Sequence, residues 1–180
     1  MNEVDIKEIK ETYKEYCDTV SKYGHPMSIE SVIWMVDLIN EGGFKKIADF
    51  GSGFSSYAIR KYCNVENHSF DTDAGWLEKT KNYLEQKSLT TDNLFVHNDE
   101  SIAEDYDLVL WDLGNKDFRK TEFLRLIGYF QNSTCIIDDC HDPRYINMCR
   151  ELGRGDDWDL EEITEVTDEF GRYVSVLRRS

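Results

Sequence analysis

KIADFGSGFSSYAIR, which runs from Lys46 to Arg60, carries the strongest structural signal in this chain. An apolar segment ends in an acid, passes through Gly-x-Gly and continues directly into a helical pattern. Because Gly51 and Gly53 lack a Cβ atom, the chain can turn tightly and a ligand can lie against bare backbone. A dinucleotide fingerprint would have a third glycine where this chain has Ser56. The segment therefore predicts a nucleotide-binding turn between a strand and a helix, with a plain glycine-rich helix start as the alternative.

Acidic residues recur at the ends of four successive apolar runs. Asp49 ends the first run, and Asp71 ends the second about 20 residues after Gly51. Asp99 and Asp112 follow the third and fourth runs. The carboxyl ends of the strands form the edge at which open α/β sheets bind ligands, and one carboxylate can accept from both hydroxyls of a ribose. Each acid alone could be a solvated turn residue, but their repeated placement predicts a ligand site.

Two of these segments resemble motifs of a known family. DFGSG, which starts at Asp49, resembles motif I of class I S-adenosylmethionine (SAM)-dependent methyltransferases, and FDTDAGWLEKTKNYL, which starts at Phe70, resembles motif II. The resemblance implies that the glycine turn faces the amino-acid part of SAM, with Asp71 at the ribose and Asp99 near the adenine. The implied cofactor-binding residues are Asp49, Gly51, Ser52, Gly53, Phe54, Ser55, Asp71, Thr72, Asp99 and Asp112.

The resemblance covers roughly residues 25–178 and implies an activity as well as a fold. That activity is transfer of a methyl group from SAM to an oxygen or nitrogen of a small molecule, in the style of small-molecule O-methyltransferases. A cofactor motif identifies binding without proving turnover, so a non-catalytic module that binds SAM or a nucleotide stays open. A nucleic-acid base methyltransferase is disfavoured, because the chain has neither an Asn-Pro-Pro-Tyr segment nor a Pro-Cys pair.

Strands and helices are expected to alternate along one domain of 180 residues. Residues 1–43 would form N-terminal helices and residues 44–180 a cofactor-binding core. The pattern predicts a doubly wound α/β fold with a mostly parallel, seven-stranded sheet, and the resemblance implies an antiparallel C-terminal hairpin. Only about eight residues separate the third and fourth strands, too few for a full crossover helix. The expected strands are 45–50, 67–71, 93–97, 106–112 and 133–138, followed by a hairpin with its turn at Asp168 to Gly171. The expected helices are 3–22, 54–63, 75–87, 117–130 and 143–152, together with a helix that Ser28 caps and that ends at Gly42-Gly43.

The composition restricts the partners and the compartment. A formal net charge of −15 disfavours tight, nonspecific binding to nucleic acid. No apolar run approaches the roughly 18 to 20 residues that cross a bilayer, so no membrane partner is expected. The charged N-terminal segment argues against a signal peptide, and the five cysteines form no Cys-x-x-Cys pair, which favours a reducing cytoplasm. The oligomeric state stays open.

A second group of acids follows the fifth expected strand. In STCIIDDCHDPRY, Asp138 and Asp139 end the strand and His141 follows. Together with Asp112, this pair resembles the site of metal-dependent O-methyltransferases of the catechol type, which implies Mg²⁺ held by carboxylate oxygens. Such an ion would orient an acceptor oxygen and lower its pKa. The chain departs from that pattern, because Asp139 stands at the position of an amide and the expected lysine is displaced to Lys116.

A metal-free interpretation uses the same residues. His141 could accept the proton of the acceptor as the methyl group moves, which makes Asp112, Asp139 and His141 the candidate catalytic residues. The alternative is structural, with the paired acids capping the next helix and His141 on a surface loop. Trp111 directly precedes Asp112, so its side chain is expected to point to the opposite face and to fill the core.

Overall fold

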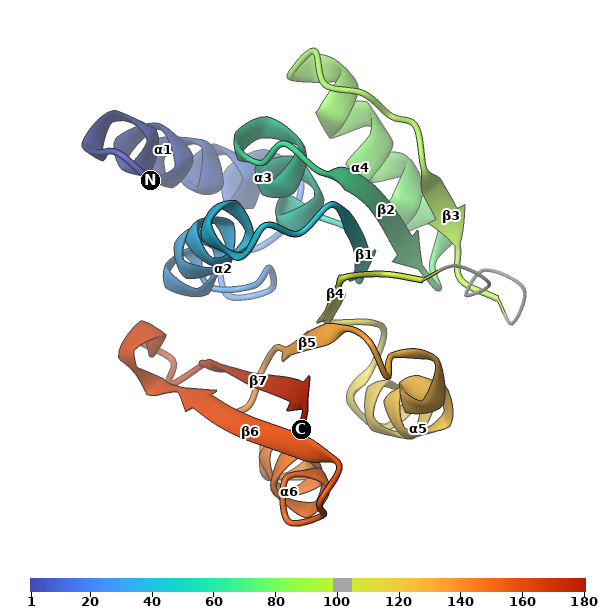
Figure 1. Ribbon diagram of the computed structural model, residues 1–180. Helices are drawn as coiled ribbons and strands as arrows, with labels where there is room; N and C mark the ends of the chain where they lie inside the picture. Colours follow the sequence, from blue (N-terminus) through green and yellow to red (C-terminus); the bar gives the residue numbers. More distant parts are fainter. Residues whose placement is uncertain (99–104) are drawn as a thin grey trace.

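The fold is built on one continuous sheet. The computed structural model describes residues 1–98 and 105–180, apart from the side chain of Lys116. The strands of this part of the chain are β1 (Lys46–Phe50), β2 (Glu66–Asp71), β3 (Leu94–Val96), β4 (Leu108–Trp111), β5 (Thr134–Ile137), β6 (Trp158–Ile163) and β7 (Val174–Arg179). They pair in the order β3-β2-β1-β4-β5-β7-β6 (Figure 1). β1 to β5 run parallel, whereas β7 pairs antiparallel with both β5 and β6.

Helices cover both faces of this sheet. They are α1 (Glu3–Thr19), α2 (Ile29–Gly42), α3 (Phe54–Tyr62), α4 (Ala74–Gln86), α5 (Lys116–Leu126) and α6 (Pro143–Leu152), with short 3₁₀ turns η1 (Ile127–Tyr129) and η2 (Thr164–Val166). Figure 1 shows α1, α2 and α3 on one side of the sheet and α5 and α6 on the other. Buried side chains of α1 to α4 share one hydrophobic cluster with the sheet, and those of α5 and α6 share a second. The predicted doubly wound α/β fold is confirmed.

The alternation of side chains along β4 connects the two clusters. Leu108 and Leu110 belong to the cluster beneath α1 to α4, while Val109 and Trp111 belong to the cluster beneath α5 and α6. Trp111 is fully buried, and its indole N–H donates to the carbonyl oxygen of Arg119 at 3.0 Å. The prediction that Trp111 fills the core is therefore confirmed.

Most predicted elements are present, with shifted ends. α1 ends at Thr19 instead of residue 22, and α2 has the predicted N-cap, since Ser28 Oγ accepts from the backbone N–H of Ser31 at 3.2 Å. The C-terminal hairpin is confirmed, but β6 ends at Ile163 and η2 precedes the turn. That turn closes as expected, because the N–H of Gly171 donates to the carbonyl of Asp168 at 3.0 Å.

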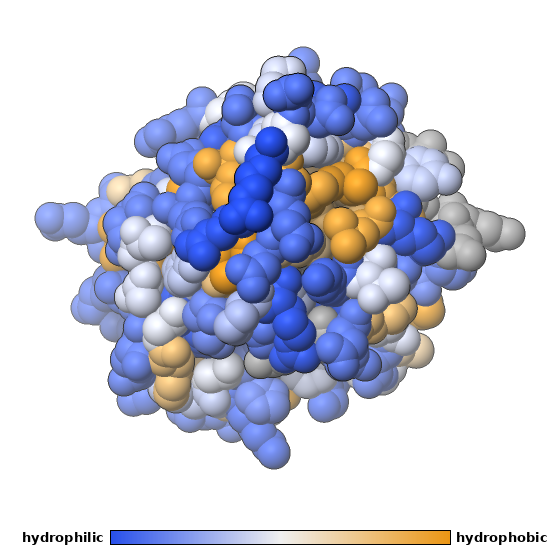
Figure 2. All heavy atoms as spheres, turned by 90° about the horizontal axis from the view of Figure 1, so that it is seen from below, coloured by the Kyte–Doolittle hydropathy of each residue, from blue (hydrophilic) through white to orange (hydrophobic). Residues whose placement is uncertain are grey.

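The surface reflects the charged composition. Seen from below, the molecule is mostly hydrophilic, and its apolar side chains gather near the middle of that face (Figure 2). Among the residues that the structure describes, no helix has both the length and the apolar character needed to span a bilayer.

The turn after β1 fits tightly between the neighbouring strands. The N–H of Gly51 donates to the carbonyl of Phe70 at 2.9 Å, which ties the turn to β2. Gly51 has a φ of +105°, and a Cβ atom there would lie 2.4 Å from the backbone oxygen of Asp112, directly after β4. Glycine is required here because both the conformation and the space exclude a side chain.

We expect Gly51→Ala to destabilise the protein more than a glycine replacement that causes conformational strain alone. Gly43→Ala is the matched control, since Gly43 has a φ of +69° and a Cβ there would meet nothing within 4 Å. Urea denaturation should give a loss of about 1 kcal/mol for the control and more than about 3 kcal/mol for Gly51→Ala. Equal losses would contradict the steric argument.

Candidate functional site

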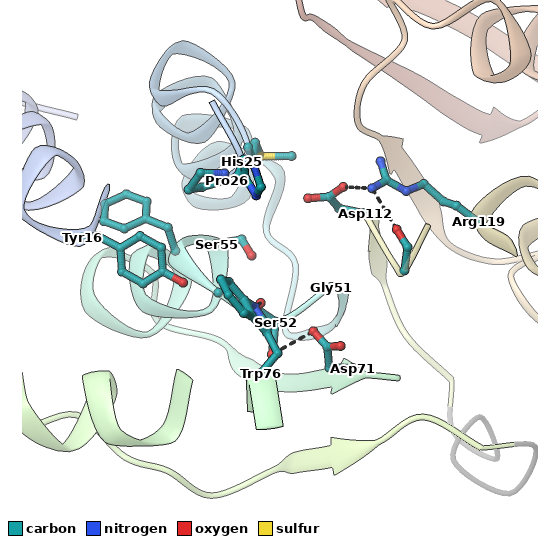
Figure 3. Close-up of a pocket in the computed structure, with 14 residues that line it drawn as sticks. Tyr16, His25, Pro26, Gly51, Ser52, Ser55, Asp71, Trp76, Asp112 and Arg119 are labelled. Carbon is teal, nitrogen blue, oxygen red and sulfur yellow. Dashed lines mark hydrogen bonds and ion pairs between the residues drawn. The ribbon is translucent and has the colours of Figure 1, made fainter. Parts of the chain in front are cut away.

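A cavity of about 260 Å³ opens at the carboxyl edge of the parallel strands (Figure 3). The turn after β1, the ends of β2 and β4, and α1, α4 and α5 all contribute to its wall, as does the loop between α1 and α2. The lining residues are Tyr16, His25, Pro26, Met27, Gly51, Ser52, Gly53, Phe54, Ser55, Asp71, Trp76, Asp112, Gly114 and Arg119. The cavity therefore brings together seven of the ten residues expected to bind cofactor.

Asp49 lies behind the glycine turn instead of in the cavity wall. Its carboxylate is fully buried and accepts hydrogen bonds from Ser55 Oγ at 2.9 Å, Ser56 Oγ at 2.5 Å and Ser69 Oγ at 3.1 Å. Burial raises the pKa of Asp49, and the serine hydroxyls and Arg60 oppose that rise. Asp49 thus fixes the first turn of α3 to β1 and β2, which places bare backbone toward the cavity.

Asp71, unlike Asp49, lines the cavity. Its Oδ2 accepts from Ser52 Oγ at 3.2 Å, and its Oδ1 accepts from the backbone N–H of Asp73 at 2.9 Å. The indole N–H of Trp76 donates to the carbonyl of Ser52 at 2.6 Å, which fixes the glycine turn to α4. Burial raises the pKa of Asp71, and the hydrogen bonds from Asp73 and Ser52 oppose that rise. Figure 3 shows Asp71 next to Ser52 and Trp76.

A second cavity, of about 390 Å³, adjoins the first around Gly114. Thr72, His97, Asn98, Phe118, Glu122 and Arg125 line it. A Cβ atom on Gly114 would lie 3.0 Å from Phe118 Cδ1 and 3.6 Å from Thr72 Oγ1, so one backbone segment separates the two cavities. Thr72, expected at the cofactor, borders this second space. Asp99 lies outside the described residues, directly after Asn98.

The structure also brings together the acids that follow β4 and β5. Oxygen atoms of Asp112, Asp138 and Asp139 all lie within 4.8 Å of one another. Arg119 lies between two of them, because its Nη2 is 2.6 Å from Asp112 Oδ1 and its Nη1 is 3.1 Å from Asp139 Oδ2. The guanidinium is also 5.2 Å from the ring centroid of Tyr145. An arginine from α5 thus already supplies a positive charge to this acidic cluster.

The charge of Arg119 determines how well a divalent ion fits here. Carboxylate oxygens are suitable ligands for Mg²⁺, but the ion demands near-octahedral geometry at short distances. An ion bound to all three acids would have to displace the guanidinium from Asp112 and Asp139. The three carboxylates, paired as they are with Arg119, therefore do not fit a resident metal ion. The side chain of Lys116, the displaced lysine of the metal-dependent pattern, lies outside the described part of the structure.

His141 lies beside this cluster but is not among the residues that line the cavity. Its Nδ1 is 3.7 Å from Asp139 Oδ1, and its side chain is 32% exposed. Asp139 has a φ of +59°, a left-handed conformation that is uncommon for a residue with a side chain. Asp142 caps α6 by accepting from the N–H of Arg144 at 3.0 Å, so the alternative in which Asp138 and Asp139 cap this helix is wrong.

His25 is a cavity residue that the sequence analysis missed. It lies in the loop between α1 and α2, and Figure 3 shows it across the cavity from Asp112. Arg172 fixes this loop by donating from Nη1 to the carbonyls of Gly24 at 2.9 Å and Pro26 at 2.8 Å. The only local signal was the helix break before Pro26, which says nothing about where the histidine points.

Comparisons with known proteins agree with the fold described above. No protein-family model matches the chain, and no curated protein matches it by sequence. Solved structures do match. A candidate caffeoyl-CoA O-methyltransferase from Staphylococcus aureus has a TM-score of 0.75 at 12% identity, over 98% of this chain and 97% of its own. This chain has the Rossmann-like methyltransferase fold.

Two further structures with this methyltransferase fold differ in what they bind or modify. The O-methyltransferase from Bacillus cereus, in complex with S-adenosylhomocysteine (SAH), has a TM-score of 0.67 at 12% identity, over 98% of this chain and 90% of its own. The tRNA (m1A58) methyltransferase from Aquifex aeolicus has a TM-score of 0.65 at 11% identity, over 90% and 73%. The methyltransferase fold itself does not select the acceptor, which depends on the residues around the cavity.

We expect Arg119→Met to destabilise the protein strongly and in a pH-dependent way. Removing one partner of a buried ion pair typically costs about 3 to 5 kcal/mol. Burial raises the pKa of Asp138 to about 7, and burial also holds the pKa of Asp112 well above its usual value. Such an acid has a higher pKa in the folded state than in the unfolded state, and it contributes stability at a pH below its unfolded-state pKa of about 4. This contribution to the free energy of unfolding is lost as the pH rises through the folded-state pKa.

Urea denaturation should therefore show a larger loss for Arg119→Met at pH 8 than at pH 5.5. Arg178→Met is the matched control, since Arg178 and Glu161 form an exposed ion pair at 2.7 Å. This surface pair should contribute less than about 1 kcal/mol at either pH. A loss for Arg119→Met that is equally small would show that the three acids do not need this cation.

Proposed function

We propose that this protein is a SAM-dependent methyltransferase that acts on an oxygen or nitrogen of a small molecule. The observation that carries the proposal is the cavity wall, in which bare glycine backbone and a buried carboxylate, Asp71, face one space at the carboxyl edge of the sheet. The SAH complex of the Bacillus cereus enzyme with the same fold supports this choice of cofactor.

The cofactor is assigned to the two adjoining cavities. Its amino-acid end lies over Gly51 to Gly53, with Ser52, Phe54 and Ser55 around it. The ribose hydroxyls bind Asp71, and the adenine lies near Thr72, where Asp99 is also proposed to contribute. Asp49 acts indirectly, because its carboxylate holds the turn from behind.

Asp71→Ala should weaken SAM binding by about tenfold or more. Hydrogen bonds to a charged group contribute about 1.5 to 3 kcal/mol, and about 1.4 kcal/mol corresponds to a factor of ten. Isothermal titration calorimetry measures the effect. Asp107→Ala is the control, because Asp107 accepts from the backbone of Lys45 and Lys46 at the opposite edge of the sheet. Equal affinity of the Asp71 variant and the wild type would refute the ribose assignment.

The methyl transfer itself needs an acceptor with a free electron pair. That pair forms the new bond to the methyl carbon while the carbon–sulfur bond breaks and its electrons remain on sulfur, which leaves SAH. The acceptor proton passes to a base. His141 is the candidate from the sequence, and His25 is a second candidate because it lines the cavity. Asp112 and Asp139, held by Arg119, set the charge beside the acceptor.

We infer that this reaction proceeds without a divalent ion, because Arg119 already pairs with Asp112 and Asp139. Mg²⁺ is the alternative cofactor, and the three acids would be its ligands in a catechol-type reaction. The net charge of −15 supports a small-molecule acceptor over nucleic acid. The odd number of cysteines supports a cytoplasmic location. We propose no membrane partner and leave the oligomeric state open.

A chelator should leave turnover unchanged, whereas loss of the base should slow the chemical step by about 10² to 10⁴. Formation of SAH with a panel of hydroxylated and amine acceptors measures turnover for the wild type, His25→Ala and His141→Ala. Turnover that EDTA abolishes and Mg²⁺ restores would favour the metal-dependent alternative. SAM binding with no SAH formed from any acceptor would favour the non-catalytic module.

A further inference from the structure

The side chain of Tyr16 is the least explained polar group in the cavity wall. Its hydroxyl is buried and has no hydrogen-bond partner within the described ranges, although the residue lines the cavity. Tyr16 as a whole is 1% exposed. Figure 3 shows its oxygen directed toward the side of the cavity where Ser52 and Ser55 lie. A buried hydroxyl normally has a partner, so this one points to a group that the protein alone does not supply.

Three other side-chain donors around the glycine turn are already paired. Ser52 Oγ donates to Asp71, Ser55 Oγ donates to Asp49, and the indole N–H of Trp76 donates to the carbonyl of Ser52. These contacts build the turn and use side-chain donors that could otherwise face a ligand. The Tyr16 hydroxyl is thus a donor at this turn that is left for a bound molecule.

The position of the hydroxyl is fixed in advance. A Cβ atom on Gly53 would lie 3.2 Å from Tyr16 Oη, so the hydroxyl lies directly over bare backbone. The ring packs edge-on against Tyr83, with centroids 4.9 Å apart, and in a tilted orientation against Phe54, with centroids 5.4 Å apart. Such packing holds the side chain in one orientation, so little freedom is lost when a ligand binds.

We propose that Tyr16 binds the cofactor by donating a hydrogen bond to the carboxylate of its amino-acid end. This inference rests on the proposed function. Burial raises the pKa of Tyr16, so the hydroxyl is neutral and keeps its proton. Another carboxylate of the cavity wall, Asp112, suits the ammonium group of the same amino acid, which leaves its carboxylate to a donor. Helix α1 is thereby part of the cofactor site.

The test compares Tyr16→Phe with Tyr83→Phe. Both changes remove one oxygen from a buried tyrosine whose hydroxyl lacks a partner among the described residues, and the two rings are in contact, but only Tyr16 lines the cavity. Calorimetry measures three ligands: SAH, decarboxylated SAH, and 5′-methylthioadenosine, which lacks the amino-acid end. Thermal melts confirm that each variant is folded.

Tyr16→Phe should weaken SAH binding by about tenfold, as expected for a hydrogen bond to a charged group. It should leave the affinities for decarboxylated SAH and 5′-methylthioadenosine within about twofold of wild type, and Tyr83→Phe should change none of the three. Unchanged SAH affinity, or an equal loss for all ligands, would overturn the role of Tyr16 while the proposed function stands. A loss for decarboxylated SAH equal to that for SAH would overturn the carboxylate contact. Wild-type protein that binds none of the ligands would overturn the proposed function.

Discussion

The buried carboxylate of Asp49 is the constraint on which the site depends. It accepts from three serine hydroxyls, of which two belong to the first turn of α3 and one to β2. A buried carboxylate is costly unless it is fully hydrogen-bonded, so these contacts strongly favour a single arrangement of the turn. Gly51 then fits against the backbone after β4, and the ends of the central strands are held together. Because Asp49 holds the turn from the side away from the cavity, the glycine backbone on the other side is left open to the cavity.

The acids after β4 and β5 show how one helix determines the charge at the edge of the sheet. Three carboxylates that converge within a few ångströms need a positive charge between them. In this chain α5 supplies it internally as Arg119, which pairs with Asp112 and Asp139. An internal guanidinium provides this charge without a bound metal ion and fixes its two partners by ion pairs. One side of the cavity is therefore bordered by an ion-pair network.

The upper wall of the cavity comes from the N-terminal part of the chain. α1 contributes Tyr16, and the following loop contributes His25. Arg172, which precedes β7, holds this loop through two backbone carbonyls and is itself paired with Asp168 at 2.7 Å. The C-terminal hairpin thus holds the loop that carries His25, so segments far apart in sequence determine the shape of the cavity.

The sequence alone determined the features that depend on neighbours in the chain. The glycine turn, the cap of α2 at Ser28 and the alternation along β4 are local, because turn chemistry and side-chain periodicity act over a few residues. The acids at the strand ends could also be predicted, since parallel strands share one carboxyl edge. This reasoning placed Asp71 and Asp112 correctly at the cavity.

Only the tertiary structure decided which side chains meet there. Asp49 was expected to face the ligand, but the serines of α3 and β2 draw it behind the turn. Arg119, His25 and Tyr16 enter the wall from three different segments, and spacing along the chain carries no signal for such contacts. Their positions follow from how α1, α5 and the α1–α2 loop pack on the sheet, because packing of distant elements depends on the complete set of buried surfaces.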